Sequence, residues 1–151
     1  MVTHPVRPIQ VAAHIAAPPA EVFAFVSDTR NDPLWCDNVE TVELVAGEDV
    51  GVGTRFRFHQ HLDRPGGERM QFDVEVEIVE LEEHTITWLA TDRFQDRQIT
   101  IEVEPEGEGS RITRVTRPAF RRPPGLARWV YPLLARRVFT RQFRELAARF
   151  Q

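Results

Sequence analysis

The sequence predicts an α+β fold in which a meandering antiparallel sheet is followed by a long C-terminal helix. Apolar and polar residues alternate over most of residues 39–117, as they do in strands with one buried face. Turns containing glycine or proline separate the alternating segments. Over roughly the last 30 residues, apolar residues instead recur three and four positions apart, which is typical of a helix with one buried side.

The N-terminal part of the chain predicts a strand followed by two short helical segments. Alternation makes residues 6–17 a strand, which ends at Pro18. Pro19 suits the first turn of a helix because the N–H that it lacks would have no partner there, and Glu21 adds a favourable negative charge. The elements expected after the strand are a helix at about residues 19–27, a turn at 28–33 and a helical turn at 34–36.

Six further strands follow, and short turns connect them. They are expected at residues 39–45, 54–62, 70–78, 85–91, 97–104 and 111–117. Short connections place consecutive antiparallel strands side by side, so a meander is the simplest topology. With the first strand, the sheet has seven strands and the element order is β-α-α-β-β-β-β-β-β-α.

The C-terminal helix is expected to change direction. Its earlier apolar stripe consists of Leu126, Val130 and Leu133, and its later one of Ala135, Phe139, Phe143, Leu146 and Phe150. On one ideal helix the centres of these stripes lie roughly 120° apart, so both cannot face one flat core. Pro132 lies between them and removes a backbone hydrogen bond. We therefore expect a bend or break there, with the two halves covering different surfaces.

Composition is that of a single compact domain spanning residues 1–151. The chain has 42% hydrophobic residues, one cysteine and a formal net charge of −4. These values argue against a disordered chain or a disulfide scaffold, and no apolar run is long enough for a transmembrane helix. The N-terminal residues lack the uninterrupted apolar core of a signal peptide, so the expected location is the cytoplasm.

The charges are unevenly distributed along the chain. Residues 40–108 contain 18 acidic residues and 6 arginines, whereas residues 117–151 contain 9 arginines and one acidic residue. We expect most arginines of this C-terminal segment to pair with the acidic sheet. The low isoelectric point, about 5.7, argues against a nucleic-acid-binding protein, which would usually be basic.

Several short motifs resemble those of one protein family. They are His14-Ile15-Ala16-Ala17-Pro18-Pro19-Ala20-Glu21-Val22-Phe23, Asp28 followed by Pro33-Leu34-Trp35, Val50-Gly51-Val52-Gly53-Thr54-Arg55-Phe56, and Thr87-Trp88. Together with the order of elements, they resemble the polyketide cyclase/dehydrase and lipid-transport family of the START/SRPBCC superfamily. The resemblance covers nearly the whole chain.

This resemblance implies a helix-grip fold, in which a strongly curved sheet wraps around the last helix and encloses a hydrophobic cavity. The expected partner is a small hydrophobic molecule such as a lipid, a polyketide or an isoprenoid-like compound, and no cofactor is implied. Apolar side chains of the sheet and the helix would bind it. The expected lining residues are Phe56, Phe58, Phe72, Val74, Trp88, Ile99, Ile101, Trp129 and Leu133.

Few residues are candidates for catalysis. Arg97 and Arg114 share strand faces with apolar residues, so each either meets an anionic group inside or reaches solvent at a strand end. Tyr131 could direct its hydroxyl at a ligand. His59 lies two residues from His61, but arginines share that face and no third ligand is suitably spaced, so we expect no metal. The catalytic candidates are Arg97, Tyr131 and His59.

Binding is therefore favoured over catalysis. The first alternative is an enzyme of the polyketide aromatase/cyclase type, which would assist enolisation and dehydration. The second is a membrane-docking or interaction module that uses the surface of residues 120–131, where apolar and interfacial side chains lie beside arginines. A nucleic-acid partner is not expected, and the chain is a monomer or a homodimer on this reading.

Overall fold

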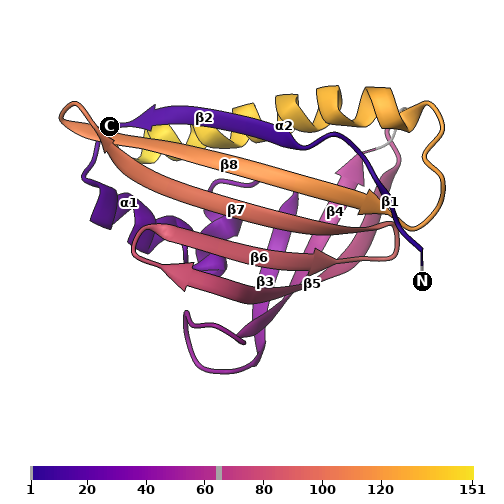
Figure 1. Ribbon diagram of the computed structural model, residues 1–151, viewed down its shortest axis with the longest axis horizontal. Helices are drawn as coiled ribbons and strands as arrows, with labels where there is room; N and C mark the ends of the chain where they lie inside the picture. The colour runs from indigo at the N-terminus through magenta and orange to yellow at the C-terminus, as the bar shows by residue number, and fades with distance from the viewer. Residues whose placement is uncertain (1, 64–65) are drawn as a thin grey trace.

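The computed structural model describes residues 2–63 and 66–151, and these form one antiparallel sheet with helices (Figure 1). The strands are β1 (His4–Pro5), β2 (Ile9–Ile15), β3 (Val39–Ala46), β4 (Arg55–Asp63), β5 (Arg69–Glu82), β6 (Thr85–Thr91), β7 (Gln95–Glu106) and β8 (Gly109–Phe120). The helices are α1 (Pro19–Val26), the 3₁₀ helix η1 (Thr29–Leu34) and α2 (Ala127–Arg149).

The sheet is the predicted meander. From β3 to β8 every strand pairs with the next one in the chain, and all pairs are antiparallel. Both β1 and β2 pair with β8 at its other edge. The α+β class and the C-terminal helix are confirmed.

The described part of the sheet has eight strands instead of seven, because the predicted first strand of residues 6–17 corresponds to β2 alone and β1 is an additional short strand before it. Pro5 pairs with Ala119, whereas Ile9 pairs with Thr116, so the register shifts by one residue between β1 and β2. Pro8 lies in this interruption and has no N–H to donate to β8.

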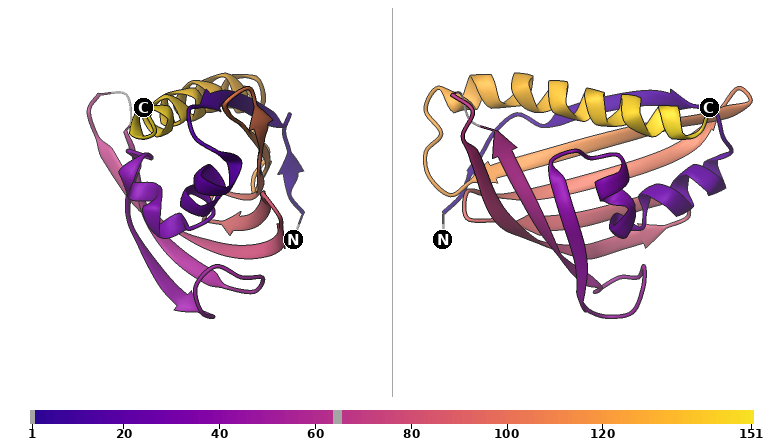
Figure 2. Two further views of the ribbon diagram at one scale, coloured as in Figure 1. Left: turned by 90° about the vertical axis from the view of Figure 1, so that its left-hand side faces the viewer. Right: turned by 180° about the vertical axis from the view of Figure 1, so that it is seen from behind.

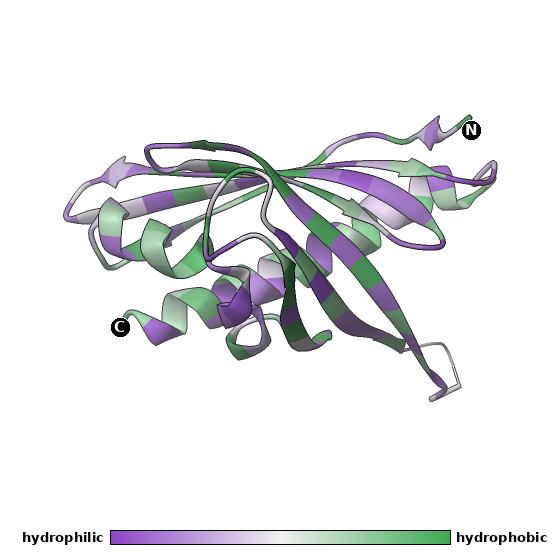
Figure 3. Cartoon of the chain, turned by 90° about the horizontal axis from the view of Figure 1, so that it is seen from below, coloured by the Kyte–Doolittle hydropathy of each residue, from purple (hydrophilic) through white to green (hydrophobic). Residues whose placement is uncertain are grey.

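The sheet curves, and α2 lies across its open side. In the end view of Figure 2 the strands surround the interior on three sides, with α1 and η1 at one end. Figure 3 shows the alternation of hydrophobic and hydrophilic residues along β5. Its inward side chains, including Val74, Val76 and Ile78, are buried. The interior is thus formed by one face of the sheet, α1, η1 and the inward side of α2.

Helix α2 continues without interruption through Pro132, so of the predicted bend or break, the break is wrong. Pro132 is the sixth residue of the helix, and it removes one backbone hydrogen bond. The loss lies close to the N-terminal end, where the first four backbone N–H groups have no partner within the helix. The later stripe faces the core, where Phe143 and Leu146 are buried. The earlier stripe covers no protein surface, because Leu133 and its neighbours on that stripe are exposed.

Residues 28–33, which were expected to form a turn, form most of η1. The Asp28 side chain caps this 3₁₀ helix by accepting a hydrogen bond from the Arg30 backbone N–H at 3.1 Å. Just beyond η1, Trp35 is buried as predicted, and its ring stacks on that of Phe143 with 6.2 Å between centroids. This packing fixes η1 against α2 and places Asp32 inside.

The predicted pairing of the C-terminal arginines with the sheet is largely wrong. In the part of the chain that the structure describes, the ion pairs of this segment are Arg121 with Asp96 and Arg141 with Asp37. Arg149 instead lies over the Phe25 ring. Most of these arginines therefore extend into solvent without a carboxylate.

Candidate functional site

The inner face of β8 carries an arginine where its neighbours are apolar or small. Arg114 lies between Ile112 and Thr116 on this face, and its guanidinium carbon is 4.0 Å from the centre of the Phe139 ring. Nε donates a long hydrogen bond to Thr116 Oγ1 (3.3 Å), and Nη1 donates one to Gln142 Oε1 (3.4 Å). Within residues 2–63 and 66–151, Nη2 has no partner and no carboxylate forms an ion pair with the group.

Asp32 brings a carboxyl group to the same region from η1. Burial raises the pKa of Asp32 to about 8, although the positive charge of Arg114 acts in the opposite direction. Burial also lowers the pKa of Arg114, while the negative forms of Cys36 and Asp32 oppose that shift. The two groups influence each other, yet they form no ion pair among the described contacts.

Cys36 is the third ionisable group here, and it is a buried thiol. Burial raises its pKa well above the ordinary value, and the nearby carboxyl of Asp32 adds to the effect. A nucleophilic cysteine needs a lowered pKa. The environment of Cys36 therefore favours a packed thiol.

Three side chains of the inner sheet face, and Asp32 of η1, are partly accessible although most of their surroundings are protein. Ala13, Ile99, Arg114 and Asp32 are only half-buried. Burial is nevertheless the largest influence on the pKa of both Asp32 and Arg114, so their surroundings are mostly protein rather than bulk water. Both groups therefore lie mostly within protein while each keeps an accessible part.

A second polar group lies further along the inner face, and it includes two of the predicted catalytic residues. Arg97 forms an ion pair with the buried Asp92 (Nη1 to Oδ2, 3.2 Å). Gln95 Nε2 donates to the Tyr131 hydroxyl at 3.1 Å, and the Tyr131 ring packs edge-on against Phe120. Arg97 and Tyr131 thus both have partners of their own within the protein.

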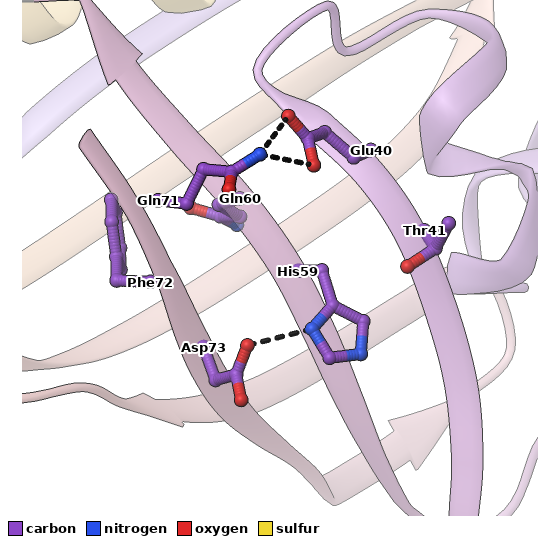
Figure 4. Close-up of a pocket in the computed structure, with 7 residues that line it drawn as sticks. All are labelled: Glu40, Thr41, His59, Gln60, Gln71, Phe72 and Asp73. Carbon is purple, nitrogen blue, oxygen red and sulfur yellow. Dashed lines mark hydrogen bonds and ion pairs between the residues drawn. The ribbon is translucent and has the colours of Figure 1, made fainter. Parts of the chain in front are cut away.

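His59, the third catalytic candidate, lies on the other side of the sheet. It faces an open hollow of about 430 Å³, shown in Figure 4, whose lining is mostly polar. His59 Nδ1 lies 2.6 Å from Asp73 Oδ1, and Gln71 Nε2 donates to both carboxylate oxygens of Glu40 at 3.1 Å. The structure therefore does not bring His59 together with Arg97 and Tyr131. No group of residues suited to a metal ion is found in the described part of the chain.

The predicted lining residues divide into two sets. The seven lining residues of the sheet face inward. Five of them are buried, namely Phe56, Phe58, Val74, Trp88 and Ile101. The other two, Phe72 and Ile99, are half-buried. Trp88 Nε1 has no hydrogen-bond partner within the described residues, so it is a further free donor inside. Trp129 and Leu133 differ, because both are largely exposed on the outer side of α2.

Sequence reasoning missed Asp32, Asn38 and Gln142. Gln142 Nε2 donates to Asn38 Oδ1 at 3.0 Å, which holds the Gln142 amide toward Arg114. Asp32 lay within a stretch of turn-forming residues, where a carboxylate is usually solvated. Gln142 did carry a signal, since it lies on the same helix face as Phe139 and Leu146.

None of the helices in residues 2–63 and 66–151 is both long and apolar enough to span a membrane.

Comparison with solved structures shows the fold. The chain is similar to TTHA0849 from Thermus thermophilus, with 23% identity, coverage of 95% of this chain and 97% of that one, and a TM-score of 0.74. Protein CV1439 from Chromobacterium violaceum is 17% identical, with 95% and 97% coverage and a TM-score of 0.70. Ginseng major latex-like protein 151 from Panax ginseng is 13% identical, with 97% and 99% coverage and a TM-score of 0.74.

A comparison with curated proteins gives no match. The family model described as polyketide cyclase/dehydrase and lipid transport matches residues 8–151. These residues include every strand of the sheet except β1, and all of the helices. The chain therefore belongs to the polyketide cyclase/dehydrase and lipid transport family, within the START/SRPBCC superfamily of helix-grip proteins.

Proposed function

We propose that this protein binds a small, largely apolar molecule between the sheet and α2, with the polar end of that molecule at Arg114. The observation that carries the proposal is a half-buried guanidinium, largely surrounded by protein, whose Nη2 has no partner among the described residues. A charged group surrounded by protein is costly unless its donors are hydrogen-bonded, so a ligand oxygen that accepts from Nη2 would be bound strongly.

The chemistry of the inner face defines the class of ligand. The buried aromatic and aliphatic side chains of β4 to β7 would contact a hydrocarbon or aromatic body. A carboxylate, an enolate or a polarised carbonyl suits the guanidinium at one end. The free N–H of Trp88 could donate to a second oxygen.

The proposal is tested with a pair of probes, a fluorescent long-chain fatty acid and its methyl ester. We expect the wild-type protein to bind both, and Arg114→Met to weaken binding of the acid roughly ten- to a hundredfold while leaving the ester nearly unchanged. Arg117→Gln is the matched control, because Arg117 is exposed on the opposite face of β8.

The outcomes separate the two parts of the proposal. If neither probe binds to the wild-type protein, binding of apolar molecules is wrong. If both bind and Arg114→Met affects acid and ester equally, Arg114 is not the polar anchor.

A second candidate is an enzyme that enolises its ligand, as a polyketide aromatase/cyclase would. The specific observation that favours it is Asp32, whose raised pKa of about 8 leaves both protonation states accessible near neutral pH. The ionised Asp32 would take a proton from the carbon between two carbonyls, and the electron pair would move onto a carbonyl oxygen that Arg114 stabilises.

Deuterium exchange into an aromatic 1,3-diketone tests this second candidate. We expect the wild-type protein to accelerate exchange at that carbon in D₂O, and Asp32→Asn to lose most of the acceleration while still binding the diketone. The control is Asp37→Asn, which removes an exposed carboxylate nearby. Equal exchange rates with and without the wild-type protein would leave binding as the sole proposed function.

A further inference from the structure

The outer side of the N-terminal half of α2 is an exposed apolar surface. It consists of Leu126, Trp129, Val130, Leu133 and Leu134, which are between 48% and 82% exposed. Their spacing of three and four residues places them on one side of the helix, opposite the buried Ala135, Phe143 and Leu146. We call these five residues the α2 apolar face.

Nothing in the described chain covers this face. Figures 1 and 2 show no other segment across the outer side of α2. Soluble monomers rarely expose large apolar side chains in such a group, and a group of this kind usually marks a contact surface. Trp129 is notable because an exposed tryptophan is unfavourable in water but stable at a membrane–water interface.

The charges around the face are positive. Arg122 precedes the helix, and Arg136 and Arg137 follow Leu133 by three and four residues, so they lie on the next turn of the same side. All three are exposed, and none has an ion pair among the described residues. The only acidic residue in residues 117–151 is Glu145, which is remote from the face along the helix.

Of the surfaces that could cover the α2 apolar face, an anionic bilayer fits both its apolar and its charged parts. Leucine and tryptophan side chains would enter the boundary between headgroups and acyl chains, while the arginines bind lipid phosphates. A second copy of this chain fits less well, because pairing two such faces would bring the unpaired arginines of both copies together.

We propose that this protein docks on anionic membrane surfaces through the α2 apolar face and the adjacent Arg122, Arg136 and Arg137. The contact lies in the plane of the interface, with α2 parallel to the bilayer. It does not depend on whether a ligand occupies the interior, and it leaves the inward side of α2 packed against the sheet.

Tryptophan fluorescence gives a direct readout of docking. Trp35 and Trp88 are buried, whereas Trp129 is largely exposed, so a blue shift on adding vesicles reports Trp129 entering an apolar environment. We expect a shift with vesicles of phosphatidylcholine containing 30% phosphatidylserine, and none with pure phosphatidylcholine. Co-sedimentation with the same vesicles gives the affinity.

Two double variants separate the apolar and charged parts. Trp129→Gln/Leu133→Gln should abolish co-sedimentation, and Arg136→Gln/Arg137→Gln should weaken it roughly thirtyfold, since each arginine near an anionic surface contributes about a fivefold factor. Arg55→Gln/Arg117→Gln removes the same charge from exposed positions of the sheet and should retain the affinity. All these side chains are exposed, so melting curves should match that of the wild-type protein.

The proposal is wrong if the wild-type protein does not sediment with anionic vesicles at low salt. It is also wrong if the sheet variant loses as much affinity as Arg136→Gln/Arg137→Gln, because attraction would then reflect charge alone. If the protein without lipid is a dimer that Trp129→Gln/Leu133→Gln dissociates, a second copy covers the face instead of a membrane.

Discussion

Asp32 makes the stability of the folded protein depend on pH in an unusual direction. Its pKa is about 8 in the folded protein and about 3.8 in an ordinary carboxyl group, so between these values the folded state holds a proton that the unfolded state has lost. Folding is then favoured at the lower pH, and this contribution is lost as the pH rises towards 8.

We therefore expect the free energy of unfolding to contain a term that falls by up to about 1.4 kcal/mol per pH unit between pH 5 and pH 8. In Asp32→Asn this term should be absent, because the amide does not titrate. The measurement is urea unfolding, followed by tryptophan fluorescence, at several pH values in this window.

The difference between wild-type and variant isolates Asp32 from all other titrating groups. Asp37→Asn is the control and should keep the wild-type slope, since Asp37 is an exposed carboxylate paired with Arg141. If Asp32→Asn has the same slope as the wild-type protein, the carboxyl of Asp32 is ionised throughout and cannot donate or accept a proton near neutral pH.

Sequence patterns identified arginines on inward strand faces. They could not decide whether each arginine meets an anionic group inside the protein or reaches solvent at a strand end. Arg114 shares its strand face with Ile112, and that parity correctly indicated an inward position. Whether its charge has a carboxylate partner depends on η1 and α2, which are distant in sequence from β8. The role of Asp32 was hidden for the same reason, because burial by other elements raises its pKa.

At the scale of elements, the start of β8 depends on a glycine. A Cβ atom on Gly109 would overlap the backbone carbonyl oxygen of Ile15 at the end of β2, and the ring of His14 lies close as well. Here β2 and β8 approach each other so closely that only a residue without a side chain fits. The β2–β8 pairing in turn carries β2 beneath α2.

We expect Gly109→Ala to destabilise the protein by about 1–3 kcal/mol, because backbone rather than a flexible side chain must move. Gly51→Ala is the matched control: its φ is not positive, and the nearest atom, Thr54 Oγ1, would be in ordinary contact at 3.9 Å. Thermal unfolding of both variants checks this. Equal melting temperatures would mean that the β2–β8 edge adjusts without cost.

The sequence was most informative where the period of two persists. It predicted β6 with both ends correct, and β4 within one residue at each end. This alternation did not predict three features of the structure: the interruption at Pro8, the 3₁₀ helix in a turn-like segment, and the continuity of α2 through Pro132. Each depends on how a few backbone hydrogen bonds are satisfied, which side-chain periodicity does not report.

At the scale of the whole molecule, the acidic sheet and the arginine-rich helix do not neutralise each other. Most described ion pairs lie on the surface, such as Arg69–Asp63 and Arg111–Glu106, whose side chains are 40–66% exposed. Exposed pairs contribute little to stability and are screened by salt. The fold is held mainly by its apolar interior, and the unpaired arginines of α2 remain available to an external anionic surface.

Salt should therefore separate folding from docking. Between about 20 mM and 500 mM NaCl we expect the melting temperature to change by less than about 3 °C, because the exposed charge pairs that salt screens contribute little to stability. Over the same range, co-sedimentation with phosphatidylserine-containing vesicles should be largely lost, because the attraction of arginines to an anionic surface is screened.

If salt instead lowers the melting temperature strongly, attraction between α2 and the sheet contributes to the fold, and the C-terminal arginines act within the protein. If the melting temperature is constant and vesicle binding survives 500 mM NaCl, the α2 apolar face alone holds the protein at the interface.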